Sequence, residues 1–378
     1  MIGIRYKIKH SCPTLGEEEQ EAVAKVIESG HIAMGEKVEE FEDALKKFVG
    51  RKHAIAVSSG TAALHLALLA LKVDRRKNVM VMSEFCESVL QAIFHAGGIP
   101  LVCEYYFDSK DCRDYVIIAQ NSLNKQRIGA SLLTFNNALL IEDFTQTIGS
   151  VAEEDGRKSG TYGHISVCSF YATKLLTTGE GGVVFTDDDD VAEFVRSKRR
   201  YRKRERFSIR YNYEMTDIAA AMGIVQLKKL PSFLEKRKEL WQKYFTLCGD
   251  IEEVFLVPSN YGYFKFYLGL TTIKTSLFIE AMEKLGVQCG RPFPRPLHRL
   301  MGYSDNGFEE TSFVSDRLIS FPLYPSLTHE EISYIVNCLK EVVKQFSPIV
   351  QANEKLLVRQ ARFLKTRRGE KDDCNPPA

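Results

Sequence analysis

The sequence predicts an α/β protein with a larger domain followed by a smaller one. Over most of the first 230 residues, short apolar runs of strand length alternate with segments whose apolar residues recur at helical spacing. Pro231 then interrupts the pattern, before a long helical segment and a second group of strands. The 378 residues are enough for two domains that each contain a core.

The overall composition argues against several classes of protein. Hydrophobic residues make up 44% of the chain and charged residues 26%, as in ordinary soluble proteins. A formal net charge of +2 gives no reason to expect a nucleic acid or an acidic membrane as partner. The nine cysteines are scattered without a Cys-x-x-Cys pair, which favours reduced thiols. Because we find no signal-peptide core and no apolar run of membrane length, we expect a soluble cytoplasmic protein.

The larger domain is expected to begin with alternating helices and strands. Helical spacing of apolar residues predicts helices, and short apolar runs bounded by turn residues predict strands. The expected helices cover residues 15–28, 36–48, 59–70 and 87–96. The expected strands cover residues 54–58, 78–83, 100–103, 115–119, 138–141, 165–171 and 183–186.

A Ser-Gly-Thr turn lies between the strand at 54–58 and the helix that follows it. The turn consists of Ser59, Gly60 and Thr61. Such a turn can bind an anion, because free backbone N–H groups and the helix dipole both point towards it. The alternative is an ordinary N-cap by Ser59 or Thr61, which is the commoner arrangement when the turn is considered alone.

An acidic pair follows the expected strand at 138–141. Ligands bind at the carboxyl ends of strands in open α/β sheets, and Glu142 and Asp143 occupy such a position. Taken alone, Asp143 is more often a helix N-cap than a functional carboxylate. Its occurrence before Lys174 in the chain favours the functional interpretation.

Lys174 follows the apolar run at 165–171, which we expect to be a strand buried on both faces. A lysine in this position is costly unless its charge is solvated, paired or removed. A neutral lysine amine can form a Schiff base with an aldehyde. The alternative is a solvated lysine that begins a loop, and from this segment alone the two interpretations are about equally supported.

Two runs of like charge follow. The four acids from Asp187 to Asp190 could suggest a metal site, but a solvated loop that caps a helix beginning near Val191 is the better supported interpretation. The basic run from Ser197 to Arg206 could suggest nucleic acid. We do not expect that partner, because the overall charge is near zero and no aromatic pattern accompanies the run. A nucleotide diphosphate on a substrate is an alternative use of these charges.

The smaller domain is expected to mix helices and strands. Pro231 marks the predicted boundary, and the long helix after it carries the single tryptophan, Trp241. Thr328 is the expected N-cap of the last helix. The chain beyond Ser347 is a basic tail, which is expected to form an extra helix followed by disorder. The other expected elements are helices at 232–247 and 276–285 and strands at 253–257, 262–272 and 287–293.

Six motifs in this order resemble the DegT/DnrJ/EryC1/StrS family of sugar aminotransferases, which use pyridoxal phosphate (PLP). The resemblance covers about residues 12 to 345 and implies the PLP-dependent transferase fold of the aspartate aminotransferase type (fold type I). It further implies a large PLP-binding α/β domain at 1–230 and a small α+β domain at 231–345, with the tail at 346–378. The motifs are Ser-Gly-Thr (59–61), Glu-Asp-x-x-Gln (142–146), Ser-Phe-x-x-Thr-Lys (169–174), Gly-Glu-Gly-Gly (179–182), Tyr-Asn-Tyr (211–213) and Pro-Leu-His (296–298).

The resemblance implies a role for each matched residue. Lys174 would hold PLP as a Schiff base and then move a proton during transamination. Asp143 would pair with the ring nitrogen, and Gln146 would contact the side of the ring that carries the hydroxyl group. Asn212 would reach the cofactor phosphate of a neighbouring subunit, which implies a homodimer. The cofactor phosphate would be held by Gly60, Thr61 and Ser169.

The chain also departs from the family pattern. The family places an aromatic residue over the PLP ring at a position that is Cys86 here, and Phe85 could serve only after a slip of one residue. A family arginine is replaced by Glu214, for which Arg210 is a possible substitute in substrate binding. His298 is a further weak candidate for the substrate site, with a core or surface histidine as the alternative. The segment from 100 to 140 is shorter than expected and lacks a family histidine.

The function implied by the resemblance is transfer of an amino group from an amino acid, with glutamate as the expected donor, to a keto group of a nucleotide-linked sugar. The product would be an amino sugar for glycans, other polysaccharides or antibiotics. One alternative is a PLP-binding protein of the same family with lost or altered catalysis, which the shortened segment and Glu214 would favour. Another is a PLP-dependent sugar dehydratase, in which a histidine replaces the lysine; Lys174 argues against it. No metal is expected.

Overall fold

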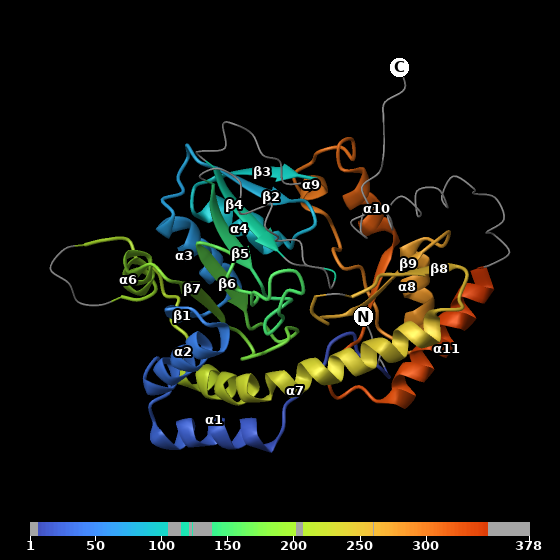
Figure 1. Ribbon diagram of the computed structural model, residues 1–378, viewed down its shortest axis with the longest axis horizontal. Helices are drawn as coiled ribbons and strands as arrows, with labels where there is room; N and C mark the ends of the chain where they lie inside the picture. The colour runs from blue at the N-terminus through green and yellow to red at the C-terminus, as the bar shows by residue number, and fades with distance from the viewer. Residues whose placement is uncertain are drawn as a thin grey trace.

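The computed structural model describes residues 7–104, 115–120, 123, 138–201, 207–259 and 261–346. A large sheet with helices on both faces and a small antiparallel sheet are connected by the long helix α7 (Figure 1). The helices are α1 (Glu17–Ser29), α2 (Glu36–Val49), α3 (Gly60–Ala70), α4 (Glu87–His95), α6 (Asp189–Lys198), α7 (Asp217–Cys248), α8 (Thr275–Lys284), α9 (Leu297–Leu300), α10 (Glu309–Arg317) and α11 (His329–Phe346). The strands are β1 (His53–Val57), β2 (Asn78–Met82), β3 (Ile99–Cys103), β4 (Tyr115–Gln120), β5 (Leu139–Asp143), β6 (Ile165–Ser169), β7 (Gly182–Thr186), β8 (Val254–Leu256), β9 (Phe266–Leu270) and β10 (Leu318–Phe321).

The large sheet is mostly parallel. Within the described residues it has seven strands in the order β1-β7-β6-β5-β4-β2-β3. Strands β6, β5, β4, β2 and β3 pair in parallel, whereas β7 is antiparallel to both of its neighbours. The carboxyl ends of the parallel strands therefore meet at one edge, where open α/β sheets bind ligands.

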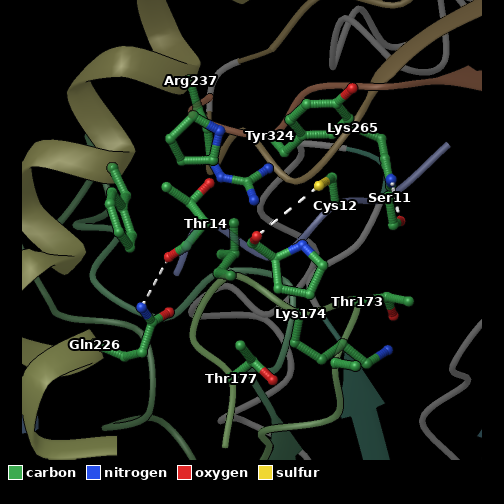
Figure 2. Close-up of a pocket in the computed structure, with 15 residues that line it drawn as sticks. Ser11, Cys12, Thr14, Thr173, Lys174, Thr177, Gln226, Arg237, Lys265 and Tyr324 are labelled. Carbon is green, nitrogen blue, oxygen red and sulfur yellow. Dashed lines mark hydrogen bonds between the residues drawn. The ribbon is translucent and has the colours of Figure 1, made fainter. Parts of the chain in front are cut away.

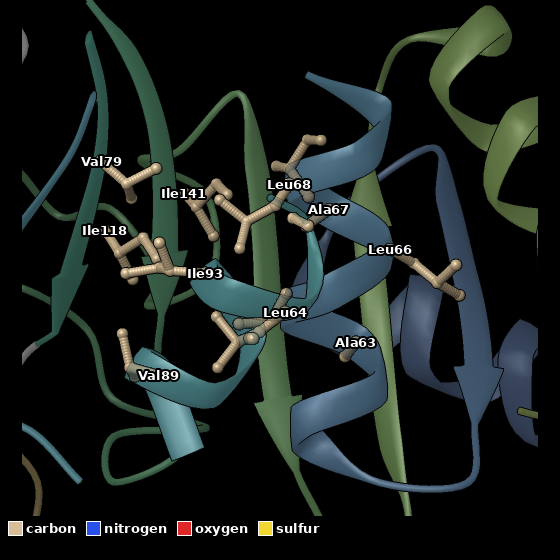
Figure 3. Close-up of a cluster of buried hydrophobic side chains, with 14 of the residues drawn as sticks. Ala63, Leu64, Leu66, Ala67, Leu68, Val79, Val89, Ile93, Ile118 and Ile141 are labelled. Carbon is tan, nitrogen blue, oxygen red and sulfur yellow. The ribbon is translucent and has the colours of Figure 1, made fainter. Parts of the chain in front are cut away.

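Alternate residues of these strands enter cores on opposite faces of the sheet. Figure 3 shows Leu64 and Leu68 of α3 and Ile93 of α4 packed against Ile118 and Ile141 of the sheet. The residues in between enter two clusters on the other face, one of which includes α2 and α7. Both faces are buried, which explains why the strands are nearly continuous apolar runs in the sequence.

The small sheet has its own core. Its described strands are antiparallel in the order β10-β9-β8. Trp241 and Tyr244 of α7 pack in this core together with α8 and α11. Ile8, near the start of the chain, is also buried there and forms a bridge to Val287. The N-terminal segment thus contributes to the same core as the last helix.

Most predicted elements are confirmed with small shifts of their ends, but two predictions were wrong. Helix α7 begins at Asp217 and continues through Pro231, so the proline does not start a separate helix. A proline inside a helix removes one backbone hydrogen bond, and here packing against α1, α2 and α11 accompanies the helix along its length. The predicted strand at 287–293 is reduced to isolated bridges at Val287 and Gly290.

Two sequence predictions fall largely outside the described residues. The structure describes only Phe346 of the predicted basic tail. It also omits residues 105–114, 121–122 and 124–137, which make up much of the segment that is shorter than the family pattern. The predicted N-cap of the last helix is confirmed, because the Thr328 hydroxyl accepts a hydrogen bond from the Glu331 N–H (3.1 Å).

Candidate active site

A cavity of about 600 Å³ lies at the carboxyl ends of the parallel strands. This volume is within the usual range for small-molecule sites. Its floor comes from the ends of β4, β5 and β6. The opposite wall is formed by residues of the small sheet and of the segments next to its strands. Of the predicted residues, Gly60, Thr61, Phe85, Asp143, Gln146, Ser169 and Lys174 line it.

Lys174 lies on the loop that follows β6. Its side chain is half-buried, and its Nζ lies 5.6 Å from the centre of the Phe264 ring. Lys174 lines both the large cavity and a small adjoining pocket of about 20 Å³, which has room for about one water molecule. Figure 2 shows the small pocket, with Lys174 on the side away from Arg237. The lysine is thus held at a cavity wall and is not a freely solvated loop residue.

Asp143 is the last residue of β5 and is 6% exposed. Its Oδ1 accepts a hydrogen bond from the Thr145 N–H (3.0 Å). Burial raises the pKa of the Asp143 carboxyl, whereas the hydrogen bonds from Thr145 and the positive charge of Lys174 act in the opposite direction. A cationic N–H in the cavity would favour the ionised form of this carboxylate.

The neighbouring acid, Glu142, has a structural role. It is fully buried, and its carboxylate accepts hydrogen bonds from the N–H groups of Gly160 (2.7 Å) and Tyr162 (2.8 Å) and from the Ser166 hydroxyl (3.2 Å). Glu142 therefore fixes the loop that enters β6, the strand that leads to Lys174. The two adjacent acids face opposite sides of the sheet because side chains alternate along a strand.

The N-terminus of α3 and the end of β6 form a cradle. Ser59 caps the helix by accepting a hydrogen bond from the Ala62 N–H (3.1 Å). An added Cβ at Gly60 would lie 2.6 Å from the Ser169 Cβ, so only glycine allows this close approach. Gly60, Thr61 and Ser169 together face the cavity at the positive end of an 11-residue helix, which suits a phosphate group.

Two further predicted residues lie on the cavity wall. Gln146 has an enclosed Oε1 atom with no hydrogen-bond partner in the described part of the chain. Phe85 is 2% exposed and packs in the core that contains Val89 and Ile93, while also contacting the cavity. Cys86 lines the cavity beside it. Stacking of Phe85 on a cofactor ring stays a prediction.

Three predicted residues do not line the cavity of this chain. Asn212 is exposed and Arg210 is half-buried on the segment that leads to α7. His298 is fully enclosed: its Nδ1 lies 2.6 Å from the Ser83 hydroxyl, and its Nε2 lies 3.0 Å from the Asp305 carboxylate. His298 was a weak candidate for the substrate site, with a core histidine as the alternative. The structure supports the alternative, because both ring nitrogens have partners inside the fold.

Sequence reasoning missed several cavity residues. Lys265 lies one residue before β9, and its Nζ donates hydrogen bonds to the Ser11 hydroxyl (2.7 Å) and the His10 carbonyl. Burial lowers the pKa of Lys265, and the charges of Arg237 and Lys174 lower it further. Gln120 ends β4 beside Asp143. The sequence could have indicated Gln120 as a cavity residue, because it directly follows the apolar run at 115–119 that was predicted as a strand.

The acidic run and Glu214 have local partners, whereas residues 202–206 of the basic run lie outside the part of the chain that the structure describes. Asp188 caps α6, Asp187 contacts Arg51 (3.0 Å), and Asp189 contacts Lys52 (2.6 Å). The Glu214 carboxylate lies 3.7 Å from the Arg200 guanidinium.

Among the described residues, no group of three or more His, Cys, Asp or Glu side chains is arranged to hold a metal ion. Over the same residues, no helix has the length and apolar character needed to cross a membrane.

A sequence model of the DegT/DnrJ/EryC1/StrS aminotransferase family matches residues 13–112 and 131–340. The chain belongs to this family. The spore coat polysaccharide biosynthesis protein SpsC of Bacillus subtilis is 28% identical, over 89% of this chain and 97% of its own length. A GDP-perosamine synthase of Vibrio cholerae is 26% identical, over 87% of this chain and 97% of its own length.

Solved structures have the same fold. The putative sugar aminotransferase Spr1654 of Streptococcus pneumoniae superposes with a TM-score of 0.81 at 22% identity, over 91% of this chain and 99% of that chain. The predicted family and the predicted fold type are therefore confirmed, and the protein is an aminotransferase. The cofactor that this membership implies is pyridoxal phosphate.

The residues of the cavity fit this cofactor. The Gly60–Ser169 contact leaves a glycine-lined recess at a helix N-terminus for the phosphate. A buried carboxylate, Asp143, faces the same cavity for the ring nitrogen, and the enclosed Oε1 of Gln146 lacks a partner within the described residues. Lys174 lines the same wall for the aldehyde. These donors and acceptors match the phosphate, the nitrogen and the aldehyde of one small ring.

Proposed function

We propose that the protein transfers the amino group of glutamate to a keto group of a nucleotide-linked sugar. The observation that carries the proposal is the placement of Lys174, Asp143 and the Gly60–Ser169 cradle on one cavity of about 600 Å³. That volume exceeds what the cofactor ring needs and leaves room for a sugar. Family membership and a relative named for GDP-perosamine synthesis support the substrate class.

Each residue would have a separate task. Pyridoxal phosphate, when bound, supplies an aldehyde that carries the amino group and a ring that withdraws electrons. Asp143 would hold a proton on the ring nitrogen through its negative charge. Gly60, Thr61 and Ser169 would bind the phosphate, and the Lys174 amine would take a proton from the substrate carbon and return one.

A first experiment tests cofactor use and amino transfer. Purified protein is titrated with pyridoxal phosphate, and the Schiff-base absorbance is followed before and after addition of glutamate. We expect the wild type to acquire the absorbance and to lose it with glutamate, and Lys174→Ala to do neither. A panel of nucleotide-linked keto-sugars is then supplied to the glutamate-treated protein. A protein that binds the cofactor but never exchanges amino groups would instead be a non-catalytic member of the family.

We further propose that the protein is a cytoplasmic homodimer with sites shared between subunits. Asn212 is exposed and lies outside the cavity of its own chain, which is compatible with service to a partner's cofactor phosphate. Light scattering should give a mass about twice the 42.9 kDa of one chain. Mixing inactive Lys174→Ala and Asn212→Ala proteins should restore activity, because each mixed dimer would contain one complete site. A monomer, or a mixture without recovered activity, would overturn shared sites.

A further inference from the structure

Gln120 occupies a position on the cavity floor that the family motifs do not include. It is the last residue of β4, and its register partner on the parallel strand β5 is Asp143. The two side chains therefore leave the sheet at the same edge, and both line the cavity. Gln120 is 7% exposed, so its amide is held inside the site and not in bulk solvent.

Within the described residues, the Gln120 amide is incompletely satisfied. Its Oε1 is enclosed and has no hydrogen-bond partner in the part of the chain that the structure describes. Leaving a buried polar atom unpaired is unfavourable, and such atoms in native proteins usually have a role. Because the two ends of an amide have nearly the same shape, the group can turn over and present either a donor or an acceptor to a ligand.

The strand order decides which part of the cofactor Gln120 would meet. Ser169 ends β6, Asp143 ends β5 and Gln120 ends β4, and these strands are consecutive in the sheet. In pyridoxal phosphate the phosphate arm and the 3-hydroxyl group lie on opposite sides of the axis from the ring nitrogen to the aldehyde carbon. If Asp143 holds the nitrogen and Ser169 the phosphate, then the hydroxyl side of the ring is directed towards β4.

We propose that Gln120 binds the 3-hydroxyl oxygen of pyridoxal phosphate by donating an amide N–H to it. This inference rests on the cofactor assignment of the proposed function. It adds a second amide to Gln146, and a phenolic oxygen can accept hydrogen bonds from both. A hydrogen bond that favours the ionised phenol would also stabilise the charge distribution of the bound ring.

The test compares two cofactors on two protein variants of similar side-chain volume. Apparent dissociation constants are measured for pyridoxal phosphate and for 3-O-methylpyridoxal 5′-phosphate, whose oxygen cannot ionise. We expect Gln120→Leu and Gln120→Met to bind pyridoxal phosphate roughly 10-fold or more weakly than the wild type, as for loss of a hydrogen bond to a charged group. With the methylated cofactor, the dissociation constants of variant and wild type should be nearly equal, because comparing both cofactors on both proteins isolates this contact.

Controls separate this contact from general damage. Gln242→Leu makes the same chemical change on the exposed face of α7 and should leave both affinities unchanged. Melting temperatures of the cofactor-free proteins check the fold. Gln120→Glu keeps an acceptor but removes the donor, so it should weaken binding at least as much as Gln120→Leu. Equal losses for both cofactors, or no loss, would overturn the inference, whereas a wild type that binds no pyridoxal phosphate would overturn the proposed function itself.

Discussion

Asp143 is the residue on which the electrostatics of the site depend most. Its carboxyl is buried at the end of β5, and burial raises its pKa. Ionising this carboxyl in the cofactor-free protein therefore costs free energy. A cationic ring nitrogen reverses this preference, so the same residue would be unfavourable for stability and favourable for binding.

We predict that Asp143→Asn stabilises the cofactor-free protein at pH 8 while weakening cofactor binding. A raised pKa means that the folded state binds the proton more tightly than the unfolded chain, so stability falls as pH rises from about 4 through the raised value. The variant should lack this fall, and its advantage should disappear at low pH. Urea unfolding at several pH values measures the difference, and cofactor affinity should drop roughly 10-fold or more. The prediction would be contradicted if the difference in unfolding free energy between the variant and the wild type were no larger at pH 8 than at pH 4.

Gly60 shows how steric space shapes the same site. A methyl group there would lie 2.6 Å from the Ser169 Cβ, so α3 and β6 would have to separate. We predict that Gly60→Ala weakens binding of pyridoxal phosphate roughly 10-fold and affects pyridoxal, which lacks the phosphate, much less. Gly290→Ala is the matched control, because a Cβ there meets no atom within 4 Å. Equal losses for the two ligands would show that the cradle is not the phosphate site.

At the scale of elements, a buried ion pair joins α2 to β1. Glu42 of α2 accepts a hydrogen bond from the Ala56 N–H (2.8 Å) and pairs with Arg199, which also donates to the Ala56 carbonyl (2.7 Å). The Arg199 carbonyl in turn accepts from the Tyr213 N–H (2.9 Å). This pair therefore fixes the segment that carries Asn212 against the strand that leads to the phosphate cradle.

We predict that Arg199→Met lowers the free energy of unfolding by about 3–5 kcal/mol, because it leaves the Glu42 carboxylate buried without its counter-charge. The double variant Glu42→Leu/Arg199→Met should recover much of this loss, since no buried charge remains. Urea unfolding of the single and double variants measures both effects. A double variant less stable than Arg199→Met would show that the pair itself supplies the stability.

The elements also show which features a sequence pattern can predict. Buried parallel strands stand out as apolar runs. Such a run placed Asp143 at a strand end where α/β sheets bind ligands, whereas the role of Lys174 was implied by the resemblance to the family; both residues line the cavity. Pro231 was misjudged because packing on both sides of α7 outweighs one missing hydrogen bond. His298 was ambiguous because its motif position does not reveal that Ser83, distant in sequence, encloses it.

At the scale of the whole molecule, the cavity is closed by parts of the chain that lie far apart in sequence. The N-terminal segment brings His10 and Ser11 to the wall, and Lys265 joins them through its hydrogen bonds. Local patterns could not predict this wall, because Lys265 in a mostly apolar segment looks like an exposed strand residue. Its burial follows from the docking of the N-terminal segment on the small sheet.

This docking predicts that the fold loses stability in acid. Burial, with a contribution from the charge of Lys265, lowers the pKa of His10 from 6.5 to about 3. The unfolded chain then binds the proton more tightly than the fold, so stability present above pH 6.5 is lost towards pH 3, by up to about 1.4 kcal/mol per pH unit. The His10 Nε2 lies 3.0 Å from the Ser320 hydroxyl, and a glutamine at this position can still hydrogen-bond to that hydroxyl. Because glutamine takes up no proton, the free energy of unfolding of His10→Gln should fall less steeply with pH over this window. His31→Gln, at an exposed site, should match the wild type; if His10→Gln matched it too, docking of this segment would not govern the acid response.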